Sequence, residues 1–200
     1  MIDKLKKSVV ADFWGKEALK NILSWPDENL VRFLGSNFPE PEKNRGFRAL
    51  EIGCGNGRNL FALEKHAFQT WGIEISEDAA DNCIKILNAA NSSVEIVKGA
   101  FEETNFGDEF FNLLVWDSPY LETVDGIKHS LGIACKTLVQ GGYMWIKFRH
   151  PDSWFSKLGI QKDEFTVYPD KRAGPYAGSL YSFFTEKQAK QILEKIGFLV

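Results

Sequence analysis

The stretch Ala49-Leu-Glu-Ile-Gly-Cys-Gly-Asn-Gly-Arg-Asn59 decides the fold, because an apolar strand pattern passes directly into a glycine-rich turn. Glycines alternate at positions Gly53, Gly55 and Gly57. Glycine adopts backbone conformations that other residues avoid, and it lets a ligand come close to the main chain. A helix expected from about Arg58 would offer unpaired N–H groups and a positive dipole end to an anionic group such as a carboxylate. The stretch therefore predicts a ligand-binding strand–turn–helix unit; the alternative is a tight turn without a ligand.

Strand and helix patterns alternate from this stretch to the end of the chain. A continuous apolar run at Phe111–Trp116 is typical of a central parallel strand. Thr185 and Gln188 form a capping-box pattern at the start of the last helix, and Gly141-Gly142 is expected to stop the helix before it. Together the patterns predict an α/β fold with a doubly wound, mainly parallel sheet. The expected strands are 47–52, 70–75, 94–97, 111–116 and 143–148, and the expected helices are 58–66, 77–90, 127–138 and 185–196.

Residues before the glycine turn predict a helical extension. Apolar residues recur at helical spacing between residues 4 and 36, and a second helix is expected to start at Pro26 with Leu30, Val31, Phe33 and Leu34 on its apolar face. A polar, proline-broken linker follows at 38–46. We therefore divide the chain into an extension with linker, 1–46, and a main domain, 47–200. The aromatic residues of the extension form either a lid over the ligand or ordinary core; they are Phe13, Trp14 and Trp25.

Composition narrows the class of protein. A net charge of −3 over 200 residues gives no basic footprint for nucleic acid or an anionic membrane. Residues 1–7 lack the apolar core of a secretory signal, and no stretch approaches the roughly 20 apolar residues of a membrane span. Cys54, Cys83 and Cys135 lie far apart, which excludes a disulfide framework or a recognisable zinc site. We expect a cytoplasmic protein without a metal ion, for which nucleic acid and membranes are disfavoured partners; its oligomeric state stays open.

The spacing of the glycines indicates the cofactor. A dinucleotide fingerprint reads G-x-G-x-x-G and would require glycine at position 58, where the chain has Arg58. Here the third glycine is Gly57, and an acidic residue, Glu51, stands two positions before the first. This pattern resembles the acidic-x-Gly-x-Gly-x-Gly signature of class I S-adenosylmethionine-dependent methyltransferases. The resemblance covers roughly residues 47–198 and implies a Rossmann-like enzyme that uses S-adenosyl-L-methionine.

The resemblance also implies which residues bind the cofactor. The family's acidic residue at the end of the second strand accepts hydrogen bonds from both ribose hydroxyls, and Glu74 stands there in this chain. The family often has an acidic residue for the adenine amino group where this chain has Ala100, so adenine contact would rely on backbone groups and on Phe101, which is equally a candidate core residue. Family members end in an antiparallel hairpin that we do not find before Val200. The implied cofactor-binding residues are Glu51, Gly53, Cys54, Gly55, Asn56, Gly57, Asn59, Glu74, Ile75, Ala100, Phe101 and Asp117.

Candidate acceptor-binding residues follow the fourth strand. Asp117-Ser-Pro-Tyr120 lies at a strand's carboxyl end, where open α/β sheets bind ligands, and it resembles imperfectly the Asn/Asp-Pro-Pro-Tyr motif of amino-group methyltransferases. That motif implies catalytic roles for Asp117 and Tyr120; the alternative is that Asp117 only orders the loop. The connection from Arg149 to Ser182 exceeds the usual two to six residues, and Phe148-Arg-His-Pro-Asp-Ser153 is similar to tellurite- and thiopurine-type methyltransferases. Arg149 and His150 are either substrate-binding or surface-loop residues.

We predict a methyltransferase acting on a small-molecule acceptor. Two alternatives stay open: an amino-group methyltransferase acting on RNA or protein through Asp117-Ser-Pro-Tyr120, and a non-catalytic domain that only binds the cofactor. Cys54 is expected to be a small spacer between glycines and not a nucleophile, because no histidine or aspartate is placed by the sequence to activate it.

Overall fold

The computed structural model describes Phe13, Lys16 and residues 24–200, which form two compact units. Unit 1 contains the chain up to Trp116 together with Thr137–Trp145, and unit 2 contains Asp117–Lys136 and Ile146–Val200. Most of the helix predicted from residue 4, including Trp14, lies outside the described residues. Within them, Trp25 is 83% exposed.

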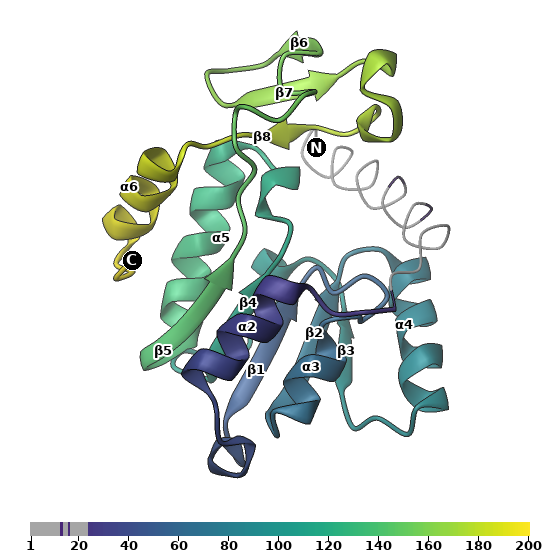
Figure 1. The fold of residues 1–200 in the computed structure, drawn as a ribbon, viewed down its shortest axis with the longest axis vertical. Helices are drawn as coiled ribbons and strands as arrows, with labels where there is room; N and C mark the ends of the chain where they lie inside the picture. Colours follow the sequence, from purple (N-terminus) through teal and green to yellow (C-terminus); the bar gives the residue numbers. More distant parts are fainter. Residues whose placement is uncertain (1–12, 14–15, 17–23) are drawn as a thin grey trace. The chain divides into compact units, whose positions relative to one another are not determined.

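Unit 1 is built on a five-stranded sheet with the order β3-β2-β1-β4-β5 (Figure 1). The strand β1 pairs in parallel with both β2 and β4, and β2 pairs in parallel with β3. This arrangement confirms the predicted doubly wound, mainly parallel sheet. The strands are β1 (Arg48–Ile52), β2 (Gln69–Glu74), β3 (Glu95–Lys98), β4 (Phe111–Trp116) and β5 (Leu138–Ile146).

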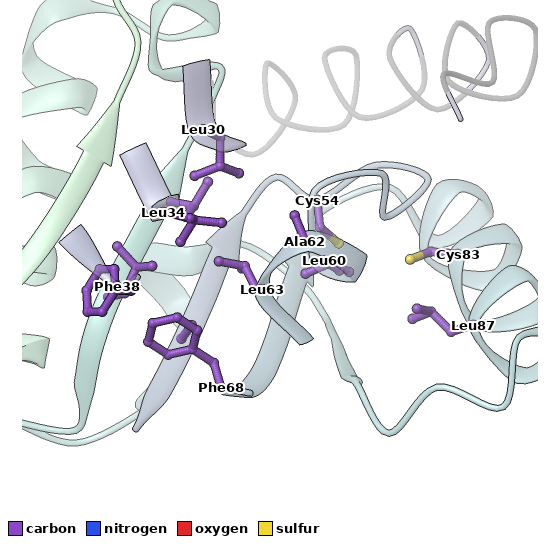
Figure 2. Packing of buried hydrophobic residues seen from close by; sticks show 13 residues of the cluster. Leu30, Leu34, Phe38, Cys54, Leu60, Ala62, Leu63, Phe68, Cys83 and Leu87 are labelled. Carbon is purple, nitrogen blue, oxygen red and sulfur yellow. The ribbon is translucent and has the colours of Figure 1, made fainter. Parts of the chain in front are cut away.

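Three helices of unit 1 contribute to one hydrophobic cluster with the sheet (Figure 2). They are α2 (Glu28–Asn37), α3 (Leu60–Lys65) and α4 (Glu77–Ala89). Leu30 and Leu34 of α2 are fully buried, as their spacing predicts, whereas Val31 is 41% exposed and does not belong to the apolar face. Leu30 and Leu34 lie on one face of the helix because they are four residues apart, whereas Val31 is the next residue after Leu30 and points away from that face.

The stretch 38–46 is more ordered than the predicted linker. Phe38 is buried in the cluster, with its ring 5.0 Å from that of Phe68. Pro41–Asn44 forms a 3-10 helix, η1, and the buried Asn44 donates a hydrogen bond from Nδ2 to the carbonyl of His66 at 2.9 Å. The prolines follow the last residue of α2, Asn37, and Phe38 beside them remains packed in the core.

The prediction that Gly141-Gly142 stops a helix is wrong. Helix α5 (Val124–Thr137) ends earlier, and β5 begins at the next residue and contains both glycines. Gly141 has a φ of +76°, and a Cβ at Gly142 would lie 3.2 Å from the carbonyl oxygen of Asn112 in β4. Gly141 thus allows a bend in the strand, and Gly142 allows β4 and β5 to come close together. The sequence alone does not distinguish these roles from a helix stop.

Unit 2 turns the long connection after β5 into a second, antiparallel sheet with the order β6-β7-β8. The last helix has the predicted capping box of Thr185 and Gln188, and it ends at Gly197 with a φ of +121°. None of the helices described in either unit is long and apolar enough to cross a membrane. Besides α5, the elements of unit 2 are η3 (Pro119–Leu121), β6 (Gly159–Gln161), β7 (Thr166–Pro169), η4 (Lys171–Tyr176), β8 (Tyr181–Ser182) and α6 (Glu186–Ile196).

Candidate functional site

The glycine turn leaves β1 in a left-handed conformation. Gly53, Gly55 and Gly57 have φ angles of +69°, +53° and +80°. The N–H groups of Gly53 and Cys54 both donate to the carbonyl of Ile73 in β2, at 2.8 and 3.1 Å. These bonds fix the turn against the end of the neighbouring strand, and only glycine takes all three positive φ values at low cost.

Gly55 and Gly57 have different surroundings. A Cβ at Gly57 would lie 2.7 Å from Cys83 Sγ and 3.3 Å from Leu60 Cδ1, so this glycine is required by packing inside the protein. A Cβ at Gly55 would meet no atom of the described residues within 4 Å. These residues therefore leave space beside Gly55 for a ligand that approaches the backbone.

Glu74, the last residue of β2, points its carboxylate at this turn. Its Oε2 accepts a hydrogen bond from the N–H of Gly55 and its Oε1 accepts one from the N–H of Ser76, both at 2.9 Å. Glu74 is only 8% exposed. Burial raises the pKa of Glu74 above its ordinary value, although the backbone hydrogen bonds from Ser76, Gly55 and Ile75 act in the opposite direction. The side chain is thus held in one orientation by backbone N–H groups.

Glu51 and Asn59 form a second buried polar pair at the turn. Asn59 donates from Nδ2 to Glu51 Oε1 at 2.7 Å, and its Oδ1 accepts from the N–H of Asp27 at 2.8 Å. Asn59 thereby connects the end of β1 to the residue that caps α2. Helix α3 begins at Leu60 and ends at Lys65, within the predicted range 58–66.

Cys54 and Asn56 complete the turn through contacts that the sequence did not reveal. A hydrogen bond with Cys83, together with burial, raises the pKa of the Cys54 thiol well above its ordinary value. A protonated, buried thiol is a poor nucleophile, in agreement with the expectation from sequence. Asn56 accepts a hydrogen bond at Oδ1 from Asn82 Nδ2 of α4, at 2.8 Å. No motif marks Asn82, because its role depends on how α4 packs beside the turn.

The loop after β3 carries the residues expected near adenine. The N–H of Gly99 donates to the carbonyl of Glu74 at 2.9 Å, which joins this loop to the end of β2. Ala100 is buried, and Phe101 is 4% exposed with its ring stacked on Phe106 at 6.3 Å. Phe101 therefore has the packing of a core residue. Ile75, beside Glu74, is half-buried.

In unit 2, Asp117 forms an ion pair with Lys147, which follows β5. Tyr120 lies in η3, with its ring nearly parallel to that of Tyr181 at a centroid distance of 6.2 Å and an angle of 12°. Lys147 was not among the residues expected from sequence, since nothing in the Asp117-Ser-Pro-Tyr120 motif indicates a basic partner 30 positions later.

Arg149 and His150 have opposite environments. Arg149 is half-buried, and its guanidinium lies over the Tyr120 ring at 4.8 Å. His150 is exposed and lies 3.3 Å from an Asp152 carboxylate oxygen. Among the residues that the structure describes, no group of three histidines, cysteines or carboxylates is arranged to hold a metal ion.

Comparison with known proteins gives the family. A family model described as a methyltransferase domain matches residues 49–142. The chain thus contains a methyltransferase domain, the catalytic domain of an enzyme that uses S-adenosylmethionine. No curated protein sequence shows a significant match.

Solved structures show the same fold in other methyltransferases. The PH0226 protein from Pyrococcus horikoshii superimposes with a TM-score of 0.69 at 19% identity, over 84% of this chain and 78% of that one. An S-adenosylmethionine-dependent methyltransferase from Clostridium acetobutylicum gives 0.64 at 14% identity, over 85% and 80%. The 1,6-didemethyltoxoflavin-N1-methyltransferase of Burkholderia thailandensis, solved with 1,6-didemethyltoxoflavin and S-adenosylhomocysteine, gives 0.62 at 16% identity, over 86% and 66%.

The residues of this methyltransferase at the glycine turn fit the cofactor chemically. The open space beside Gly55 accommodates a close approach to the backbone. The Glu74 carboxylate, already oriented by two N–H groups, retains acceptor positions suited to a vicinal diol.

Proposed function

We propose that this methyltransferase transfers a methyl group to a small-molecule acceptor. The glycine turn binds the cofactor, and Asp117 and Tyr120 bind the acceptor. The observation that carries the proposal is the orientation of Glu74, whose two carboxylate oxygens are each held by one backbone N–H. A buried carboxylate fixed in this way is oriented to accept hydrogen bonds from a ligand without a rearrangement.

The cofactor-binding roles follow from the contacts around the turn. Glu74 accepts hydrogen bonds from the two ribose hydroxyls, and the backbone at Gly53–Gly57 approaches the amino-acid portion of the cofactor. The backbone of Ala100 and Phe101 contacts adenine, because the Phe101 ring is engaged with Phe106. Glu51 and Asn59 position the turn through their buried hydrogen bond. When bound, the cofactor supplies a methyl group on a sulfonium, which is electrophilic without help from the protein.

The acceptor-binding roles are assigned to Asp117 and Tyr120. Asp117, held by its ion pair with Lys147, accepts a hydrogen bond from an N–H or O–H of the acceptor and so orients the attacking lone pair. The Tyr120 ring, held between its contacts with Tyr181 and Arg149, lines the acceptor site. Holding the acceptor in an attack geometry supplies much of the rate gain in such a displacement.

A small acceptor is supported by the net charge of −3, because the chain has no overall excess of basic residues to bind RNA. The Burkholderia thailandensis neighbour, which shares the fold, is named for a small-molecule substrate. RNA and protein acceptors are the alternatives that the test must distinguish.

The test is transfer of a tritiated methyl group from S-adenosylmethionine to three separate fractions: metabolites, RNA and protein. We expect label in the metabolite fraction. The label should be lost in Glu74→Ala through weaker cofactor binding, and it should be reduced in Asp117→Asn. Asp125→Asn is the matched control, since this aspartate is 97% exposed on α5. Label confined to RNA or protein would overturn the small-molecule assignment, and cofactor binding without transfer to any fraction would favour a binding domain.

A further inference from the structure

Arg149 of unit 2 lies inside a box of four aromatic rings. Its guanidinium carbon is 4.8 Å from the ring centroid of Tyr120, 5.1 Å from Tyr176, 5.2 Å from Phe155 and 5.8 Å from Tyr181. These distances lie within the range of cation–π attraction. The rings come from η3, η4, β8 and the segment before β6, so separate parts of the unit converge on one cation.

The rings of this box hold one another in place. Phe155 and Tyr176 stack with a centroid distance of 4.3 Å and an interplanar angle of 3°. Tyr181 meets Phe155 edge-on at 5.0 Å and stacks on Tyr120 at 6.2 Å. Phe155 and Tyr181 are almost completely buried. A box built from mutually packed rings is rigid, so the position of the guanidinium is fixed before any ligand arrives.

Arg149 has no anionic partner among the described residues. Its Nε is buried without a hydrogen-bond acceptor, and no described carboxylate lies within ion-pair distance of its guanidinium. Lys147, two residues earlier, is by contrast paired with Asp117, and Arg172 is paired with Asp170 at 2.7 Å. Arg149 is half-buried, and removing part of a guanidinium from water without an opposite charge beside it is costly. Attraction to ring faces offsets only part of that cost.

We infer that Arg149 binds a carboxylate of the methyl acceptor and that the acceptor is an aromatic acid. This inference rests on the proposed function and names the class of its substrate. A guanidinium offers a planar, forked set of donors that matches a carboxylate. The rings around Arg149 favour a ligand whose carboxylate is attached to an aromatic ring, because that ring packs on aromatic faces. The carboxylate of the acceptor thus supplies the anionic partner that the Arg149 guanidinium lacks among the described residues.

The test is a ligand-observed NMR titration of the full chain, saturated with S-adenosylhomocysteine, with a panel of substituted benzoates and the matched benzamides. We expect benzoates to bind on the order of tenfold or more tightly than their amides, and Arg149→Gln to remove that preference. Equal binding of acids and amides by the wild-type protein, or an unchanged preference in Arg149→Gln, would overturn the inference. Aryl phosphates binding more tightly than the benzoates would also overturn the assignment to a carboxylate.

Two variants separate ligand binding from folding. Arg48→Gln is the matched control, because Arg48 also stacks on a ring, Phe110 at 4.1 Å, with a buried Nε that has no acceptor, but without an enclosing box. This variant is expected to keep the acid preference. If Arg149→Gln does not fold, Arg149→Lys keeps the charge and loses the forked donors, and it should retain only part of the preference. Binding of S-adenosylhomocysteine in the same samples reports separately on the proposed function: its loss would refute the cofactor site, whereas its presence without acid preference would refute only the role of Arg149.

Discussion

Substituting the two inner glycines of the turn should separate stability from cofactor binding. Gly57→Ala places a methyl group 2.7 Å from Cys83 Sγ and 3.3 Å from Leu60 Cδ1, where both side chains are fully buried and have no room to move. A left-handed backbone costs a non-glycine residue about 1–2 kcal/mol. Overpacking of a filled core costs about 1–3 kcal/mol. We therefore expect Gly57→Ala to lower the free energy of unfolding by about 2–5 kcal/mol.

The methyl group of Gly55→Ala meets no atom of the described residues within 4 Å, so the expected cost in the unliganded protein is that of the left-handed backbone. Its free energy of unfolding should fall by about 1–2 kcal/mol. The added methyl occupies space that we assign to the cofactor, so the affinity for S-adenosylhomocysteine should fall by about ten- to a hundredfold, equivalent to an overpacking cost of about 1–3 kcal/mol.

The assay is urea unfolding together with calorimetric titration. It compares four variants: Gly55→Ala, Gly57→Ala, Cys83→Ala and the double variant Gly57→Ala/Cys83→Ala. Removing the thiol should restore the overpacking part, so the two substitutions should couple by about 1–3 kcal/mol. Additive effects would refute the steric argument at Gly57. A Gly55→Ala protein that binds S-adenosylhomocysteine like the wild type would refute the placement of the cofactor beside the turn.

Three further outcomes follow from the charged residues. Because burial raises the pKa of Glu74 above 4.5 and only its ionised form accepts two ribose hydrogen bonds, affinity for S-adenosylhomocysteine should decline on acidification before pH 4.5 is reached, and calorimetry on Glu74→Ala should show no such decline. Hydrogen bonds from Ser92 and Ser93 lower the pKa of Glu64 below 4.5, although partial burial acts in the opposite direction. Glu64 therefore stabilises the fold above pH 4.5, and this stabilisation disappears as the pH falls through the lowered pKa. The melting temperatures of Glu64→Gln and wild type should converge at low pH. Lys147→Met, which removes the partner of Asp117, should reduce methyl transfer by on the order of tenfold or more at constant cofactor affinity, and unchanged transfer would contradict the role of the pair.

Sequence predicted the parts of the molecule that depend on local patterns. The strand 111–116 and the capping box at Thr185 are found as predicted, because apolar periodicity and capping chemistry act over a few residues. The glycine spacing and the acidic residue at the end of the second strand were recognisable for the same reason. Glu74 proves to face Gly55, 19 residues earlier, since both stand at the ends of paired parallel strands.

Sequence did not predict the contacts that depend on packing between distant segments. The pair of Asp117 with Lys147 and the ring box around Arg149 join residues separated by tens of positions, with no motif to connect them. We expected the connection after the fifth strand to be a loop. Its strands β6–β8 are only two to four residues long, which is too short for an alternation of apolar and polar residues to show in the sequence. Gly141-Gly142 was assigned to a helix stop because a bent strand and a helix end require glycine for related reasons.

The central claim is that the glycine turn and Glu74 bind S-adenosylmethionine, and calorimetric titration of the wild-type chain with S-adenosylhomocysteine tests it most directly. We predict binding at one site per chain, weakened in Glu74→Ala by about 1–3 kcal/mol, the cost of losing hydrogen bonds to a charged acceptor. Heat of binding with NAD and none with S-adenosylhomocysteine, or equal affinity in Glu74→Ala, would contradict it.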